Sequence, residues 1–179
     1  MSRRLLVSIH LYLAAFFAPM VIIMAVSGGL HLLGVKEVMT STELGYVSGL
    51  KLDADSPSLS SDVRTALQSL GVDARFEYVK GRGGEFSTRP SSREHYRLSQ
   101  QADGVAITTV SPNWQAALME LHMGHGPRWY KWFETGFSLG LIFIMISGLY
   151  LGLMSAAYRR QTLVLCGGGL LLFLALAFL

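Results

Sequence analysis

The hydrophobic pattern of the chain is dominated by three long runs without a charged residue, Leu11–Leu30, Phe137–Met154 and Leu163–Leu179. An α-helix rises about 1.5 Å per residue, so about 20 residues cross the hydrocarbon core of a bilayer, which is about 30 Å thick. Each run is therefore predicted to form a transmembrane helix. The first run exceeds the roughly 7–15 apolar residues of a signal peptide, and no clear cleavage pattern follows it, which favours a retained anchor.

The segment between the first two spans changes to short helical and alternating patterns. Residues 56–62 are rich in serine, proline and aspartate, which favour helix starts, and Val63, Leu67 and Leu70 follow at helical spacing. Gly71 closes this run. A helix of about three turns is therefore predicted here.

Two β-hairpins are predicted after this helix, because apolar and polar residues alternate on both sides of turn-forming glycines. A further helix is predicted over Asn113–Met123, with Trp114, Leu118, Leu121 and His122 on one side. The predicted hairpin strands are 75–80 with 85–88, joined by the turn 81–84, and 95–100 with 105–110, joined by the turn 102–104.

Together these elements predict a membrane α-helical protein with three transmembrane helices and a small α+β domain outside the membrane. Glycines 124 and 126 and Pro127 end the last helix of that domain, and the aromatic and basic segment Arg128–Phe133 is typical of a helix entering lipid. The predicted organisation is an N-terminal tail with the first span at 1–34, the small domain at 35–126, the aromatic belt with the second span at 127–156, and a cytoplasmic loop with the third span at 157–179.

Basic residues near the ends of the spans set the expected orientation, since lysine and arginine collect on the cytoplasmic side. Arg3 and Arg4 precede the first span, and Arg159 and Arg160 lie between the second and third spans. These flanks place the N-terminus in the cytoplasm and the small domain outside. In a bacterial inner membrane, the outside is the periplasm.

Composition narrows the function classes. The chain has 179 residues, of which 51% are hydrophobic, and its net charge of +3 is too small and too scattered to indicate nucleic-acid binding. The single cysteine, Cys166, excludes an internal disulfide and a cysteine-based zinc or iron–sulfur site. No constellation for hydrolysis is visible, and residues 81–84 fit a hairpin turn better than a phosphate-binding loop. Glycines 136, 140, 148 and 152 indicate close packing of helices.

Histidines at the membrane boundary are the candidate functional residues, because ionisable side chains there are costly. His10 and His31 flank the first span, at a helical rise of about 31 Å, so they cannot share one metal ion. His31, His122 and His125 are expected just above the outer surface of the membrane. His95 lies in a predicted strand among charged neighbours and is expected to be an ordinary surface residue.

Four short motifs follow one another at characteristic positions. They are Ile9-His10-Leu11-Tyr12-Leu13, Val26-Ser27-Gly28-Gly29-Leu30, Leu121-His122-Met123-Gly124-His125-Gly126 and Ile146-Ser147-Gly148-Leu149-Tyr150-Leu151. In this order the chain resembles the PepSY-associated transmembrane family over most of residues 5–154. Members of that family are bacterial inner-membrane proteins with small periplasmic PepSY domains. The larger ones include reductases that take iron from ferric siderophores with b-type haem held by membrane histidines.

Carried over residue by residue, the resemblance implies that His10, His31 and His122 are haem ligands, with His125 as an alternate. A b haem held by two histidines also needs an apolar slot and cationic or hydroxyl groups near its propionates. His10 has no histidine partner near the inner end of another span, so a haem there needs another subunit or a different ligand. For the outer haem, the expected walls are Leu30, Phe133 and Phe137, and the expected propionate contacts are Arg128, Lys131 or Tyr130.

Two function classes remain open. In the first, the protein binds b haem at its periplasmic side and passes electrons to an oxidised acceptor there, such as a ferric siderophore. In the second, it is a non-catalytic accessory or assembly subunit, whose PepSY-like domain binds a partner protein while its helices pack in a larger complex or against a second copy. A copper or zinc site made by His31, His122 and His125, with Met119 and Met123 as soft donors, is a further alternative. Another alternative is that the histidines at the membrane boundary only form structural hydrogen bonds.

Overall fold

A computed structural model describes residues 2–35 and 38–179. Residues 36 and 37, which belong to the predicted domain 35–126, lie outside the described residues. The chain forms two compact units. One contains residues 2–21 with Thr135–Leu179, and the other contains Ile22–Glu134.

Three helices have the length and apolar composition needed to cross a membrane, as predicted. They are α1 (Arg3–Leu32), α4 (Arg128–Met154) and α5 (Arg159–Phe178). α1 and α4 contain whole apolar runs and α5 covers its run up to Phe178, and each helix begins before its run, in polar or aromatic residues, because backbone hydrogen bonding continues as long as no residue breaks the helix. Gly124 has a φ of 72° between α3 and α4, where the sequence predicts a break.

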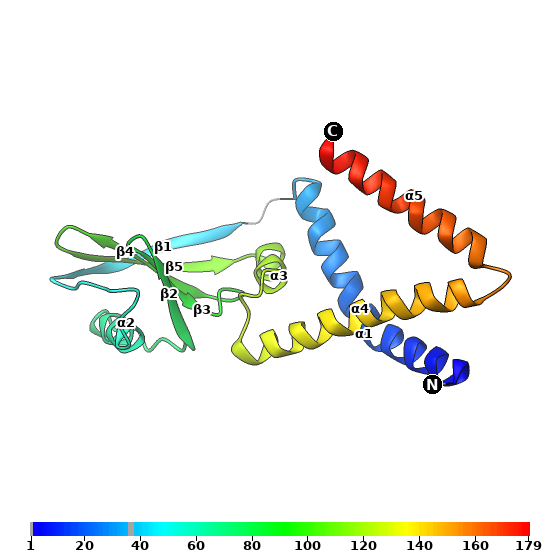
Figure 1. The fold of residues 1–179 in the computed structure, drawn as a ribbon. Coiled ribbons are helices and arrows are strands. Elements are labelled where there is room, and N and C mark those ends of the chain that lie inside the picture. The colour runs from blue at the N-terminus through cyan, green and yellow to red at the C-terminus, as the bar shows by residue number, and fades with distance from the viewer. Residues whose placement is uncertain (1, 36–37) are drawn as a thin grey trace. The chain divides into compact units, whose positions relative to one another are not determined.

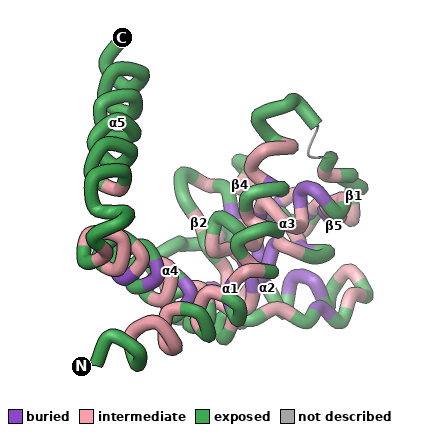
Figure 2. The backbone as a smooth tube through the Cα atoms, turned by 90° about the vertical axis from the view of Figure 1, so that its right-hand side faces the viewer, coloured by how far each residue is buried: buried purple, intermediate pink, exposed green. Residues whose placement is uncertain are grey.

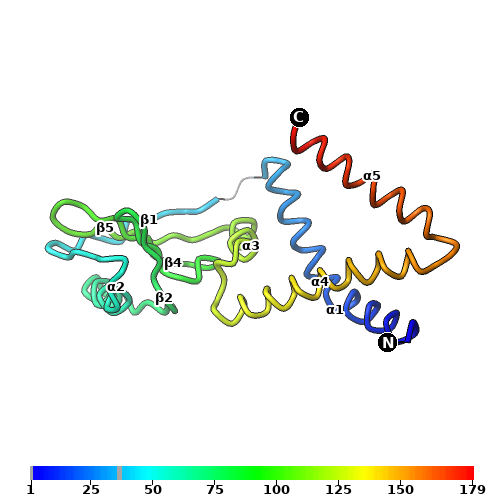
Figure 3. The backbone as a smooth tube through the Cα atoms, in the orientation of Figure 1, coloured from blue at the N-terminus to red at the C-terminus, as the bar shows by residue number. Residues whose placement is uncertain are grey.

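The small domain is built on a five-stranded antiparallel sheet in the order β1-β5-β4-β3-β2. Both predicted hairpins are confirmed, and Figure 3 traces their backbone. Gly83 and Gly84 form the first turn with φ values of 60° and 84°, as a tight hairpin turn requires. The strands are β1 (Met39–Ser48), β2 (Tyr78–Arg82), β3 (Glu85–Arg89), β4 (His95–Gln101) and β5 (Gly104–Pro112).

Strand β1 is the element that the sequence analysis does not predict. It pairs antiparallel with β5 along its length, with a register shift between Glu43 and Gly45. Its first half is almost entirely exposed, so it lacks the alternation of buried and exposed residues that marks a strand in sequence. The position of this edge strand is therefore determined by its backbone pairing with β5 and not by a buried face of its own.

One face of the sheet is covered by α2 (Leu59–Ser69), as Figure 1 shows. Val63 and Leu67 of α2 are fully buried against Leu98 and Ile107 of the sheet. Gly71 follows the helix with a φ of 80°, in the left-handed region that glycine adopts at low cost. The predicted helix and its end are therefore confirmed.

Helix α3 (Trp114–His122) is confirmed, and polar side chains are among its buried residues. Asn113 caps the helix by accepting a hydrogen bond from the backbone N–H of Ala116 at 2.8 Å. The buried residues are Gln115, Ala116 and Glu120, whereas Trp114 is 62% exposed. The polar side chains go inside because they find partners there, which apolar periodicity cannot reveal.

In the unit that contains residues 2–21, α1 and α4 pack through small and aromatic residues. The Phe17 and Phe137 rings meet edge to face with centroids 5.4 Å apart. A Cβ added at Gly140 would lie 2.4 Å from the Phe17 ring, so only glycine fits this crossing. Glycines 148 and 152 also face neighbouring side chains closely, but a Cβ at Gly136 meets nothing within 4 Å. Helix α5 has no buried residue, as Figure 2 shows.

Candidate functional site

His10 of α1 faces Ser147 of α4. The imidazole Nδ1 lies 2.8 Å from Ser147 Oγ, and this serine is 4% exposed. Gly148 follows the serine, and a Cβ added there would come within 3.2 Å of His10 Cε1. The serine therefore offers a hydrogen-bond partner to the imidazole ring, and the glycine leaves room for it.

His122, the last residue of α3, faces Ser27 of α1 in the same way. The imidazole Nδ1 lies 3.4 Å from Ser27 Oγ, at the long end of the hydrogen-bond range. A Cβ added at Gly28 would lie 3.9 Å from His122 Cε1. Beside this pair, the fully buried Gln115 donates from Nε2 to the Ser27 carbonyl at 3.0 Å, while its Oε1 has no partner among the described residues.

The serine hydrogen bonds favour one tautomer of both imidazoles. Ser147 Oγ donates its one proton to the Ile144 carbonyl at 3.1 Å, and Ser27 Oγ donates its proton to the Met24 carbonyl at 3.0 Å. With the hydroxyl protons on these carbonyls, each serine accepts from a histidine, and Nδ1 of His10 and of His122 is then the protonated ring nitrogen. Neither Nε2 atom makes a hydrogen bond to a described residue. In the neutral rings, both Nε2 lone pairs are left for a ligand.

The pairs His10–Ser147 and His122–Ser27 repeat the same contact within the chain. In each, an imidazole from one helix lies against a Ser-Gly step in another. The histidines and the two Ser-Gly steps stand out in the sequence, but their pairing does not, because 137 positions separate His10 from Ser147 and 95 separate Ser27 from His122. Ser27 and Ser147 are thus site residues that sequence reasoning missed.

His31 lies in the last turn of α1 and is exposed. It follows Ser27 by four residues, so about one helical turn separates it from the residue that His122 contacts. The structure therefore brings His122 to the same end of α1 as His31.

His125 belongs to a buried polar network in the small domain. Its Nδ1 lies 2.9 Å from Glu120 Oε2, and Glu120 is only 7% exposed. The same carboxylate accepts a hydrogen bond from Ser91 and lies 3.5 Å from Arg89 Nη1. This network connects α3 to the end of β3. The Nε2 atom of His125 makes no hydrogen bond within residues 2–35 and 38–179, so His125 keeps a lone pair for a ligand.

His95 is buried, contrary to the predicted surface position. It lies in the predicted strand, but it is 4% exposed and donates from Nδ1 to the Arg93 carbonyl at 3.0 Å. Its strand partner Val110 is fully buried on the same face. Burial lowers the pKa of His95, while the Arg93 carbonyl and the charge of Glu120 oppose that shift.

Acidification is expected to destabilise the small domain through His95. Because its pKa is lowered in the folded state, the unfolded chain binds the proton first as the pH falls through about 6.5. This contribution to stability is present above that pH, decreases below it, and becomes constant below the folded pKa. Thermal unfolding of the full chain in detergent, followed by tryptophan fluorescence between pH 8 and 5, should show a weaker pH dependence in His95→Gln. An identical dependence in both proteins would contradict this role.

Arg128 and Lys131, the predicted propionate contacts, lie against Tyr78 of β2. Lys131 Nζ donates to the Tyr78 hydroxyl at 2.6 Å, and the Arg128 guanidinium lies 5.8 Å from the centre of that ring. The backbone N–H of Arg128 also donates to Glu77 at 2.7 Å. Both residues thus join the start of α4 to the sheet.

The predicted copper or zinc alternative lacks a compact ligand set. Across residues 2–35 and 38–179, no three histidine, cysteine, aspartate or glutamate side chains lie close enough to hold a metal ion. His122 and His125 diverge because one turns to Ser27 and the other to Glu120. A three-histidine site is therefore not formed by His31, His122 and His125.

The fold and these contacts define a membrane protein with three helices able to span a bilayer and a small five-stranded antiparallel domain. No family model, curated protein or solved structure matches the chain. Function is therefore argued from the chemistry of the histidine–serine pairs.

Proposed function

We propose that this protein is a membrane electron-transfer component that binds b-type haem through membrane-boundary histidines, as a small member of the PepSY-associated transmembrane family. One observation carries the proposal: Nδ1 of His10 and of His122 faces a serine whose hydroxyl also lies within donating distance of a backbone carbonyl, an arrangement that leaves Nε2 available for a ligand. Histidines that bind metals usually donate their other ring N–H to such a partner. The donor chemistry therefore fits iron at each ring.

The outer site uses His122 with His31 as the second ligand and His125 as the alternate. Ser27 orients the His122 ring, Gly28 leaves room beside it, and Gln115 fixes the Ser27 carbonyl. Bound haem supplies one-electron transfer, and its acceptor in this proposal is an oxidised periplasmic compound such as a ferric siderophore. At the inner site His10 provides one ligand, so another copy or a different subunit provides the second.

Visible spectroscopy tests the proposal. The full chain, purified in detergent from haem-replete cells, should show a Soret band that shifts on reduction with dithionite and a sharp reduced α band. Extraction of the pigment as a pyridine haemochrome should identify b haem. A colourless protein, even after addition of hemin to the purified chain, would rule out the haem proposal.

We place the protein in a bacterial inner membrane with its N-terminus in the cytoplasm. Arg3, Arg4, Arg159 and Arg160 support this orientation by the preference of basic flanks for the cytoplasm. In a Cys166→Ala background, Asp55→Cys in the exposed loop before α2 should react with a membrane-impermeant maleimide in intact spheroplasts. Labelling only after the membrane is broken would reverse the assignment.

The accessory-subunit function is the second candidate, and helix α5 favours it. No residue of α5 is buried, and a Cβ added at any of its three glycines, 167 to 169, meets nothing within 4 Å. Such a surface suits lipid or another helix. A protein that lacks haem but co-purifies with a membrane complex, and loses that complex when Gly168 becomes leucine, would support this function.

A further inference from the structure

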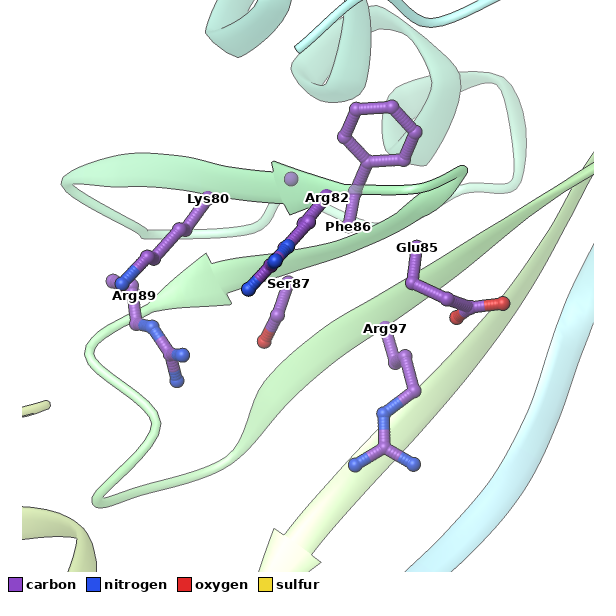
Figure 4. A pocket seen from close by; sticks show the side chains of 8 residues that line it. Lys80, Arg82, Glu85, Phe86, Ser87, Arg89 and Arg97 are labelled. Carbon is purple, nitrogen blue, oxygen red and sulfur yellow. The ribbon is translucent and has the colours of Figure 1, made fainter.

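The sheet face opposite α2 carries a pocket of about 440 Å³, a volume typical of small-molecule sites. Phe86 of β3 points into the core beneath α2, so its neighbours Glu85, Ser87 and Arg89 lie on the opposite face. Figure 4 shows these side chains on the side of the sheet away from Phe86. We define the basic pocket by the polar side chains Lys80, Arg82, Glu85, Ser87, Arg89 and Arg97.

The strand register brings these side chains together. Lys80 pairs with Ser87, and Ser87 pairs with Arg97, so a lysine and an arginine flank one hydroxyl across three strands. In the adjacent row Arg82 pairs with Glu85. Directly paired residues point to the same face with their Cβ atoms about 5 Å apart. The register therefore concentrates positive charge on a small area of rigid sheet.

The charge of this pocket is only partly balanced. It contains four cationic side chains and one carboxylate. The carboxylate of Glu85 accepts a hydrogen bond from Ser99 at 2.6 Å, and it forms no ion pair with Arg82 or Arg97. Within the described ranges, Lys80, Arg82 and Arg97 make no side-chain hydrogen bond or ion pair. These three side chains are therefore ready to bind an anion.

Arg89 is a lining residue of the basic pocket that is held by the protein itself. Its side chain is 12% exposed, and its Nη1 is held by Ser91 and Glu120. Its Nε is buried and has no hydrogen-bond partner among the residues that the structure describes. A buried donor without a partner is uncommon in folded proteins. Arg89 thus lines the pocket and carries a donor that the described residues leave unsatisfied.

Guanidinium groups present paired donors that match the oxygens of phosphate, and lysine adds a compact charge. The hydroxyl of Ser87 lies between them, and its long hydrogen bond of 3.4 Å to the Thr88 carbonyl can be exchanged for one to a ligand. A neutral or purely apolar ligand would leave the cations unbalanced. The chemistry therefore favours a multivalent phosphate-type anion over other small molecules.

We propose that the basic pocket is a binding site for a multivalent phosphate-type oxyanion, held by Lys80, Arg97 and Arg82 with Ser87 as a hydrogen-bond donor. This site is separate from the histidine–serine pairs and does not depend on haem. The phosphate comes either from a soluble compound or from a lipid headgroup.

Calorimetric titration of the full chain in detergent, at low ionic strength, tests the proposal with two probes. Pyrophosphate represents a soluble anion, and dihexanoyl phosphatidic acid below its micellar concentration represents a lipid headgroup. Because loss of a charge-assisted hydrogen bond corresponds to about tenfold in affinity, Lys80→Gln and Arg97→Gln should each raise Kd about tenfold or more. Glu85→Gln should lower Kd, since it removes the one negative charge.

Arg75→Gln is the matched control, because Arg75 is exposed, lies before β2 and is not part of the pocket. It removes the same charge and should leave Kd within about twofold, as expected for a screened surface charge. The probe with the lower Kd identifies the source of the phosphate. No binding of either probe, or equal weakening by Arg75→Gln and Arg97→Gln, would overturn the site.

Discussion

A protein carrying His122→Ala is expected to lose the reduced α band of the proposed outer haem. The variant removes the imidazole whose Nε2 lone pair is kept available by the Nδ1 contact to Ser27, and alanine offers no replacement ligand. His31→Ala should have the same effect if it is the second ligand. The measurement is the dithionite-reduced minus oxidised spectrum of purified protein, normalised to protein concentration.

Two further variants separate a ligand role from a structural one. Ser27→Ala removes only the acceptor of the imidazole N–H, so haem should still bind, about 10–100-fold more weakly. The midpoint potential should rise, because the imidazole then donates less charge to iron. His95→Gln alters a buried histidine whose Nδ1 bonds to the Arg93 carbonyl, and its spectrum should be unchanged. A normal spectrum in His122→Ala would remove this residue from the haem site.

Replacing Glu120 by alanine is expected to destabilise the small domain by about 3–5 kcal/mol, because Arg89 then remains buried without its counter-charge. Ser91 and His125 also lose the acceptor that holds them. Urea unfolding of the full chain in detergent measures this effect. Trp114, Trp129 and Trp132 all lie within Ile22–Glu134, so tryptophan fluorescence reports on this unit alone.

Glu94→Ala is the matched control, since Glu94 is exposed and, among residues 2–35 and 38–179, accepts a single long hydrogen bond, from Ser111 at 3.3 Å. A change within about 0.5 kcal/mol is expected there. The double variant Glu120→Leu with Arg89→Met should recover much of the stability, because it removes both buried charges together. Equal destabilisation by Glu94→Ala and Glu120→Ala would show that the buried network contributes nothing specific.

The helices and hairpins followed from sequence because each has a local signal. An uncharged run long enough to cross a bilayer has few soluble alternatives, and the turn at Gly83-Gly84 uses backbone angles that glycine adopts readily. The edge strand β1 has no such signal, since its partner β5 lies more than 50 residues later in the chain. Pairing across that distance is a property of the folded sheet.

The candidate site was predictable only in part. Histidines beside apolar runs are conspicuous, so His10, His31, His122 and His125 could be named from the sequence. The orientation of their rings could not, because hydrogen bonding depends on which serine or carboxylate the fold brings near. For the same reason His95 was expected to be exposed and Glu120 was not singled out, although both are buried among polar partners.

The sequence by itself determined that three segments are apolar enough to cross a membrane, that a small α+β domain lies between the first two, and that histidines mark the boundaries. These properties depend on composition and short-range periodicity, which the chain carries before it folds. Only the tertiary structure decided that Ser27 and Ser147 hold the imidazoles and that Lys80, Arg82 and Arg97 share one face of the sheet. Side chains far apart in the chain become neighbours through strand register and helix crossing, and their chemistry depends on those neighbours.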